Sequence, residues 1–434
     1  MIGISNESAP DNSKSNGRVI PADMIVPLEP QLVSLENRME ESLRGLTNCL
    51  AYDTALESIY AEPNVGQLNA YVQQFEAGAL TIGLEDISNT AKKNWDKTSN
   101  RLKELQKETI EYGRVISMGA DRMFGQLESM YVQAEDIRNK PYVPTIQISG
   151  AKRFNIDGNL DINDVTRLSG LTMSTFGFYD KSFIGFMDSV IKLLSQLSFE
   201  EAFVEKVSIN WATFNPTKWL VKPVPVQNDE RFRVNAPLFR TPPAQGNRAI
   251  YASGPTESKT EDIKNWAFMV NMVRDMSFRY YTVRDLKPLP EKVTTVNVSP
   301  VKEIQQRIAN LLNLVKQIQK RKGWESKLSN GIRKLGETGE QVRNKAAAIR
   351  PAPKTETDKA TSEPAKDANG AISDVVQSTS IMLNNTARII VDYNNAMAGI
   401  LRTIGALSHI AELELAAYRP PAKVADPQVP PPQQ

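Results

Sequence analysis

The sequence predicts an α+β protein that is mostly α, in which long helices flank a central mixed segment with short antiparallel strands. Prolines recur between residues 141 and 299 too densely for long helices to run through. Short runs inside this segment, such as Thr145–Ile148, alternate apolar and polar residues with the period of a strand. On both sides, apolar residues recur at steps of three and four over long stretches that are almost free of proline.

These patterns divide the chain into segments. We expect a flexible tail (1–29), a long-helix acidic arm (30–140), the mixed segment (141–299), a basic helical segment (300–349), a disordered linker (350–370), a heptad helix (371–418) and a proline-rich tail (419–434). The first 30 residues lack the basic region and apolar core of a secretory signal. No window approaches 18 uninterrupted apolar residues, so we expect no membrane contact.

The arm begins with a helix at Pro30, which Pro63 ends because proline removes a backbone donor. A second helix is expected at 65–77 and a much longer one at 85–139. A helix of about 50 residues spans roughly 75 Å and gains little from propensity alone, so it needs partners along its length. We favour an intramolecular bundle with the first helix over a rod used in assembly.

The mixed segment carries predicted strands at 145–148, 208–214 and 231–234, and amphipathic helices at 182–197 and 261–276. Aromatic residues concentrate here: Trp211, Phe214, Trp219, Phe232, Phe239 and Tyr251. Aromatic rings are able to stack on nucleic-acid bases, but rings at strand spacing are more often core, which is what we expect.

The last helix, at 371–418, has the most regular pattern, with apolar steps of four and three that continue without a slip. Charges are sparse along it, whereas an isolated two-stranded coiled coil carries charges beside its seam. We therefore expect this helix to be buried on several sides, in a bundle or against another chain.

Enzyme chemistry has little support in the residue inventory. Cys49 and His409 are the only cysteine and the only histidine, which excludes an intrachain disulfide and a Cys- or His-rich metal site. We expect Cys49 in the core and His409 in a helix, either buried or at the surface. No Gly-rich phosphate loop and no Ser-His-Asp pattern occurs, so we expect neither an enzyme nor a cofactor.

One stretch resembles the second half of a calcium-binding loop, and its candidate ligands are Asp157, Asn159, Asp161 and Asp164. The position of the leading acid, however, is held by the cation Arg153. Asp157-Gly158 is also a common turn between strands. The turn is the favoured interpretation.

Charge is unevenly spread along the chain. Residues 1–140 hold 14 Lys+Arg against 21 Asp+Glu, a net −7, and residues 301–350 hold 12 against 4, a net +8. Cations on successive helical turns neutralise phosphates without reading sequence. The candidates for nucleic-acid contact are Lys316, Lys320, Arg321, Lys322, Lys327, Arg333 and Lys334. A solvated helix face, or pairing with the acidic arm, explains the same cations.

The order of acidic arm, mixed segment, basic segment, Lys/Pro linker and final helix, with the opening Met1–Ser8 and the stretch Gly246–Ile250, resembles one known family. It is similar, over most of the chain, to the phiKZ-like internal head proteins of giant (jumbo) tailed bacteriophages. The resemblance implies a virion structural protein that is made in the host cytoplasm and packed inside the capsid with the genome. Its implied partners are other head proteins, packaged DNA and a phage prohead protease.

The resemblance also implies trimming by that protease, which cuts after a glutamate preceded at two residues by a small residue. Glu36, Glu57, Glu85 and Glu200 stand in such triplets, which also arise by chance. Removal of an acidic leader would unmask the basic remainder. The alternative function is a helical scaffold or adaptor outside the mature virion, with self-association through its helices; an unrecognised hydrolase in the mixed segment is a third.

Overall fold

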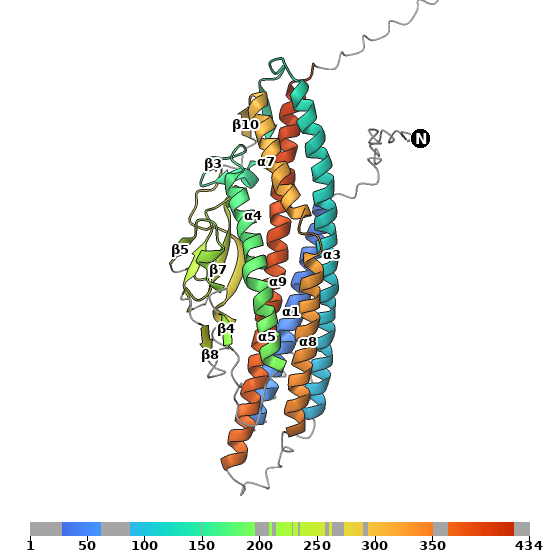
Figure 1. Cartoon of the computed structure of the whole chain (residues 1–434), viewed down its shortest axis with the longest axis vertical. Helices are drawn as coiled ribbons and strands as arrows, with labels where there is room; N and C mark the ends of the chain where they lie inside the picture. Colours follow the sequence, from blue (N-terminus) through green and yellow to red (C-terminus); the bar gives the residue numbers. More distant parts are fainter. Residues whose placement is uncertain are drawn as a thin grey trace, which may run out of the picture.

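The computed structural model describes residues 28–61, 87–148, 150–195, 208–210, 214–227, 229–232, 235–256, 260–262, 273–289, 294–349 and 363–420. Long helices run side by side in a bundle, and the strands lie on one side of it (Figure 1). The bundle helices are α1 (Leu28–Ala61), α3 (Ile87–Asp136), α7 (Val301–Gln319), α8 (Trp324–Ile349) and α9 (Glu363–Ala417). None of the helices in the described part of the chain has a stretch long and apolar enough to cross a membrane.

The helix α9 lies in the middle of the bundle, where it contacts α1, α3, α7, α8 and the strand β9 (Ser277–Thr282) (Figure 1). Tyr393, Met397 and Ile400 on α9 are completely buried. Burial on several sides, as predicted from the scarcity of charge, is confirmed. A helix that is buried on several sides needs no polar face, which explains why α9 carries so few charges.

The acidic arm folds into this bundle. The stripe of α1 that includes Leu32, Met39 and Leu46 is fully buried and packs on α3 and α9. Along α3, Leu105, Ile116 and Leu127 are likewise buried at helical spacing. The intramolecular bundle is therefore the observed arrangement. The helix expected at 65–77 lies outside the described residues.

A sharp break separates α7 from α8. Gly323 at this break has a φ of 91°, which is a left-handed conformation that glycine adopts without a steric penalty. The chain then re-enters the bundle at Trp324, whose ring meets that of Tyr393 edge-on at 5.3 Å.

The mixed segment attaches to the bundle through a bent helix. It consists of α4 (Thr166–Phe178), a π-helical turn η4 (Tyr179–Phe183) and α5 (Ile184–Ser195). The sequence predicted only its second half. The first half, with hydroxyl residues such as Thr172 and Thr175 buried and bonded to the carbonyls four residues earlier, carries no polar stripe by which to recognise it.

The strands form small antiparallel sheets. The largest has the order β5-β6-β7-β9, where β5 is Val224–Val226, β6 is Leu238–Arg240 and β7 is Arg248–Ser253. The pairs are β1 (Thr145–Ile148) with β10 (Thr294–Asn297), β2 (Asn155–Ile156) with β3 (Asn159–Leu160), and β4 (Ser208–Asn210) with β8 (Thr260–Asp262). The α+β class, mostly α with short antiparallel strands, is confirmed.

Two predictions in this segment were wrong in part. Arg231, expected in a strand, lies in a turn, because its guanidinium reaches back to Asp229. Glu261, expected to begin a helix, lies in β8 opposite Ile209. The predicted start of the helix at 261–276 was therefore wrong, and residues 263–272 of that prediction lie outside the described residues.

The aromatic residues of this segment are largely core. Phe178 of α4 stacks on Phe278 of β9 with ring centroids 4.4 Å apart and lies 5.0 Å from the ring of Trp219. Phe214, Trp219 and Tyr251 are buried. Phe214 and Trp219 belong to the core shared with the bundle, whereas Tyr251 packs in a separate cluster with Phe232; Trp211 lies outside the described residues.

Candidate nucleic-acid interface

The seven predicted cations lie along the end of α7, the turn after it and the first half of α8. All of them are exposed except Arg321, which is half-buried. Cations in the last turn of α7 are favourable for the helix itself, because they meet the negative end of its dipole. The relevant question is which of them are already engaged within the molecule.

Arg321 and Lys322 both have partners in the chain. Arg321 binds Asp180 at 2.8 Å, and its guanidinium carbon lies 4.0 Å from the ring centroid of Phe176. Lys322 binds Asp121 of α3 at 2.8 Å. Burial raises the pKa of the Asp121 carboxyl, but hydrogen bonds from Lys322 and Gln319 outweigh this and leave the pKa below its usual value. Both cations therefore hold the α7–α8 turn to the rest of the bundle.

Lys316 and Arg333 have weaker partners. The ammonium of Lys316 lies 5.4 Å from the ring centroid of Phe124 on α3. Arg333 forms an exposed ion pair with Glu337, one turn further along α8, at 2.6 Å. Exposed pairs of this kind exchange with water readily and contribute little to stability.

Lys320, Lys327 and Lys334 make no ion pair or side-chain hydrogen bond with any residue in the described part of the chain. All three are exposed, and they recur at intervals of seven residues. On α8 this interval places Lys327 and Lys334 roughly 10 Å apart along the axis and on the same side of the helix. These three cations are the part of the predicted set that is free for an anionic partner.

The acidic arm neutralises other cations of the C-terminal helices. Arg343 of α8 forms an ion pair with Asp53 of α1, and both side chains are largely buried; the guanidinium also lies 4.2 Å from the ring centroid of Trp95. Arg402 of α9 binds Glu36 at 2.7 Å. Pairing between the arm and the basic helices, which was the alternative explanation of the charge asymmetry, thus occurs. It leaves the three lysines free.

The candidate calcium ligands are occupied by turn and cap hydrogen bonds. Asp157 and Gly158 form the turn between β2 and β3, with φ values of 54° and 82°. Asp157 Oδ1 accepts from the Lys287 backbone N–H at 3.1 Å, and Asp164 Oδ1 accepts from that of Thr166 at 2.8 Å. Asp161 Oδ1 in turn accepts from the Asp164 N–H at 2.9 Å. No group of three or more metal-ligating side chains occurs among the described residues.

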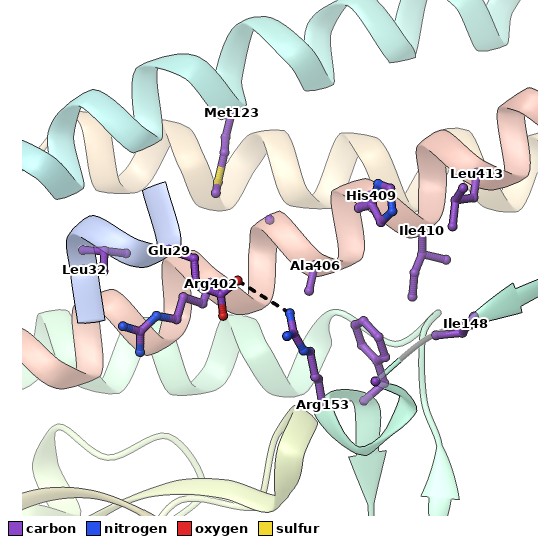
Figure 2. A pocket seen from close by; sticks show the side chains of 13 residues that line it. Glu29, Leu32, Met123, Ile148, Arg153, Arg402, Ala406, His409, Ile410 and Leu413 are labelled. Atoms are coloured by element: carbon purple, nitrogen blue, oxygen red, sulfur yellow. Dashed lines mark ion pairs between the residues drawn. The ribbon is translucent and has the colours of Figure 1, made fainter. Parts of the chain in front are cut away.

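A cavity of about 390 Å³ lies where the first turn of α1 meets α9 and the short helix η3 (Ala151–Phe154). Figure 2 shows Glu29 and Arg153 facing each other across it, with an N–O distance of 3.9 Å, and Met123 and Ile410 on its apolar walls. His409 lies at the rim, where its Nδ1 is 3.3 Å from Glu412 and its side chain is mostly exposed. The lining brings no nucleophile to this histidine.

Comparison with protein families decides the identity. The family described as phiKZ-like phage internal head proteins matches residues 75–413, which include the whole of α3, the mixed segment and most of α9. The chain belongs to this family. The resemblance inferred from the sequence is confirmed, and the family places the protein in the interior of the phage head. Comparison with curated proteins and with solved structures gave no significant match.

Two of the four candidate processing sites of the internal head protein lie in a folded helix, and the other two lie outside the described residues. Glu36 lies within α1, and its carboxylate binds Arg402 and accepts from the Tyr112 hydroxyl at 3.2 Å. Glu57 also lies within α1. Glu85 and Glu200 lie outside the described residues. Cleavage needs an extended substrate strand, so the folded α1 shields the bond after Glu36.

The sequence predicted the basic segment of the internal head protein but not which of its cations are free of partners within the molecule. Nothing local distinguishes Lys322, which is engaged by Asp121, from Lys320, which is not, because the partner lies about 200 positions away. Spacing does not supply the missing signal, because the step from Lys320 to Lys327 crosses the break at Gly323 and only Lys327 and Lys334 lie on one side of one helix.

Proposed function

We propose that this internal head protein is a non-enzymatic structural component that is packed with the phage genome and contacts DNA phosphates through Lys320, Lys327 and Lys334. The observation that carries the proposal is that these three lysines remain exposed and unpaired while neighbouring cations are engaged within the molecule. Such contacts neutralise phosphates without selecting a sequence, which suits a protein that meets the genome wherever it is packed.

The fold supports a packing role over a catalytic one. The bundle is held by one continuous apolar core that spans α1, α3, α7, α8, α9 and the mixed segment. The cavity beside α1 is walled largely by apolar side chains and a long ion pair, and its histidine, His409, lies mostly exposed at the rim. Other head proteins are the natural neighbours of such a block.

Salt-dependent DNA binding tests the proposal. Each phosphate contact contributes about 0.9 to the slope of log K against log salt, so Lys320→Gln/Lys327→Gln/Lys334→Gln is expected to reduce the slope by about 2.7. The control replaces Lys181, Lys218 and Lys287, three exposed lysines of the mixed segment, and should leave the slope nearly unchanged. Equal loss in both triple variants would show that only net charge matters, and would contradict the proposed face.

We further propose that trimming by a prohead protease, if it uses Glu36 or Glu57, precedes closure of the bundle. Support comes from the helical state of α1 and from the Arg402 and Tyr112 contacts to Glu36. Cleavage after Glu36 would also remove Leu32 and Leu35 from the core. Intact-mass analysis of the protein from purified virions identifies the mature terminus. A fully folded precursor that is cut efficiently after Glu36 in vitro would contradict the order of events.

The alternative, a helical scaffold or adaptor outside the mature virion, is favoured by one feature. The exposed side of α3 carries apolar side chains that no described residue covers, among them Met118 and Val132, exposed by 52% and 54%. Mass spectrometry of purified virions separates the two roles, because a scaffold that leaves the particle would be absent from it.

A further inference from the structure

The outward face of α3 carries a charged row that repeats every seven residues and, beside it, an apolar row with steps of eight, seven and seven. Its exposed positions at steps of three and four alternate between two rows. One row carries Ile110, Met118, Gly125 and Val132, and the other carries Lys107, Arg114, Asp121, Glu128 and Glu135. In Figure 1, α3 lies at the edge of the bundle away from the strands. This face is therefore a seam with the spacing of a coiled coil and no covering helix among the described residues.

The charge row changes sign once, at its midpoint. Lys107 and Arg114 are positive, whereas Asp121, Glu128 and Glu135 are negative. No side chain of Lys107, Arg114, Glu128 or Glu135 forms an ion pair with another residue of the described ranges, and all four are exposed. Asp121 at the midpoint is instead neutralised by Lys322 of the same chain, at 2.8 Å. The positive and negative halves of the row are thus complementary in charge to each other. Apart from Asp121, their side chains have no ion-pair partner among the described residues.

A second copy of the same face, turned antiparallel about a two-fold axis near residues 121 and 122, satisfies both rows except at the axis, where Asp121, already paired with Lys322, meets its own copy. Ile110 then faces Val132, Arg114 faces Glu128 and Lys107 faces Glu135, and each pairing occurs twice because the axis relates the copies. A parallel arrangement would instead set like charges opposite each other. Gly125, which has no atom within 4 Å of a Cβ built on it, would let the two helices approach closely beside Met118.

We propose that this seam is a self-association surface on which two copies of the chain pair through antiparallel α3 helices. The apolar row is short and interrupted, so the dimer is weak, and it forms at the high protein concentration of a packed compartment. The inference does not depend on DNA contact. The seam of α3 and the three free lysines use different side chains, and each test works without the other.

Sedimentation velocity of the full chain, without DNA and at low salt, tests the proposal. We expect a monomer–dimer equilibrium that weakens as salt is raised, because the pairs are exposed. Arg114→Glu places two like-charge pairs in the dimer and should raise the dissociation constant at least about tenfold. Combining it with Glu128→Arg restores opposite charges across the axis, and should return the constant to within a few-fold of the wild-type value.

The matched control is Arg167→Glu, which reverses an exposed arginine on α4, on the strand side of the bundle. It should leave the dissociation constant unchanged. The proposal is overturned if the wild-type chain stays monomeric up to about 1 mM, a range that covers weak specific association. It is also overturned if Arg114→Glu has no more effect than Arg167→Glu, or if the charge swap fails to restore the dimer. In those cases the seam serves a different partner or none.

Discussion

The carboxylate of Glu414 lies completely buried against the guanidinium of Arg307, which is itself almost fully buried. Arg307 also donates to the Ile162 carbonyl at 3.2 Å, and Glu414 accepts from the Ser299 backbone N–H at 3.0 Å. Burial lowers the pKa of Arg307 to about 10, so its charge persists at neutral pH. The pair connects α7 and α9 to the mixed segment at a point where both side chains are almost completely buried.

Breaking this pair is therefore expected to be costly. Glu414→Gln leaves the guanidinium buried without a counter-charge and should destabilise the protein by about 3–5 kcal/mol. The double variant Arg307→Met/Glu414→Leu should recover most of the loss, because it buries no charge. Urea unfolding measures both, with the exposed Glu337→Gln as control, for which a change below about 0.5 kcal/mol is expected. A small effect of Glu414→Gln would mean that water reaches the pair.

A second residue-scale prediction concerns pH. The hydrogen bond from Arg231 holds the pKa of Asp229 below its usual value. A carboxyl with a lowered pKa in the folded state contributes stability above its ordinary pKa of 3.8, and this contribution disappears as pH falls through the folded value. Asp229→Asn should thus cost up to about 1 kcal/mol at neutral pH and nothing at a pH well below 3.8. Thermal unfolding from neutral pH down to about pH 2 measures this; a constant difference across the range would contradict it.

At the scale of elements, α9 and β9 meet through a glycine. A Cβ at Gly399 would lie 2.3 Å from the ring of Tyr280 and 2.7 Å from its hydroxyl. Gly399→Ala therefore forces the sheet away from the bundle, and a loss of about 1–3 kcal/mol is expected from such overpacking. Gly185→Ala on α5 is the matched control, since that site is open and alanine favours a helix by about 0.5–1 kcal/mol. Thermal unfolding of the two variants should shift in opposite directions.

Helices with a regular apolar period were predictable from the sequence. Elements whose conformation depends on contacts in the folded structure were not. The stripe of α1 and the four-three steps of α9 predicted both helices and, through the missing charges, the burial of α9. The first half of the bent helix, α4, escaped because its exposed side carries Thr166, Met173 and a single charge, Arg167, and so shows no polar stripe. Arg231 was misplaced because its conformation depends on Asp229 and on the rings around it, including that of Tyr251 at 5.2 Å.

The candidate interface was predictable as a region and not as a set of residues. The basic composition of 301–350 pointed to the helices that carry the exposed cations, because net charge is a property of the segment. Whether a given lysine is free depends on acids from other elements. Asp121 binds Lys322 and Asp180 binds Arg321, whereas neither acid pairs with Lys327 or Lys334.

At the scale of the whole molecule, the acidic arm and the basic helices close into one bundle around α9, and the mixed segment packs on one side of it (Figure 1). Ion pairs within the molecule neutralise part of the charge difference between the acidic arm and the basic helices. Among the charges that remain outward are three free lysines, one directly after α7 and two on α8, and on α3 a seam whose charges change sign halfway. We interpret the first as the contact to DNA and the second as the contact to another copy of the chain.

Lysine acetylation in intact phage heads, read by mass spectrometry with the DNA present and after its release, tests the central claim most directly. The account predicts that Lys320, Lys327 and Lys334 are protected in filled heads and become reactive in emptied ones. Lys181, Lys218 and Lys287 should react equally in both. Equal reactivity of the first three lysines in filled and emptied heads, or absence of the protein from the heads, would contradict the account.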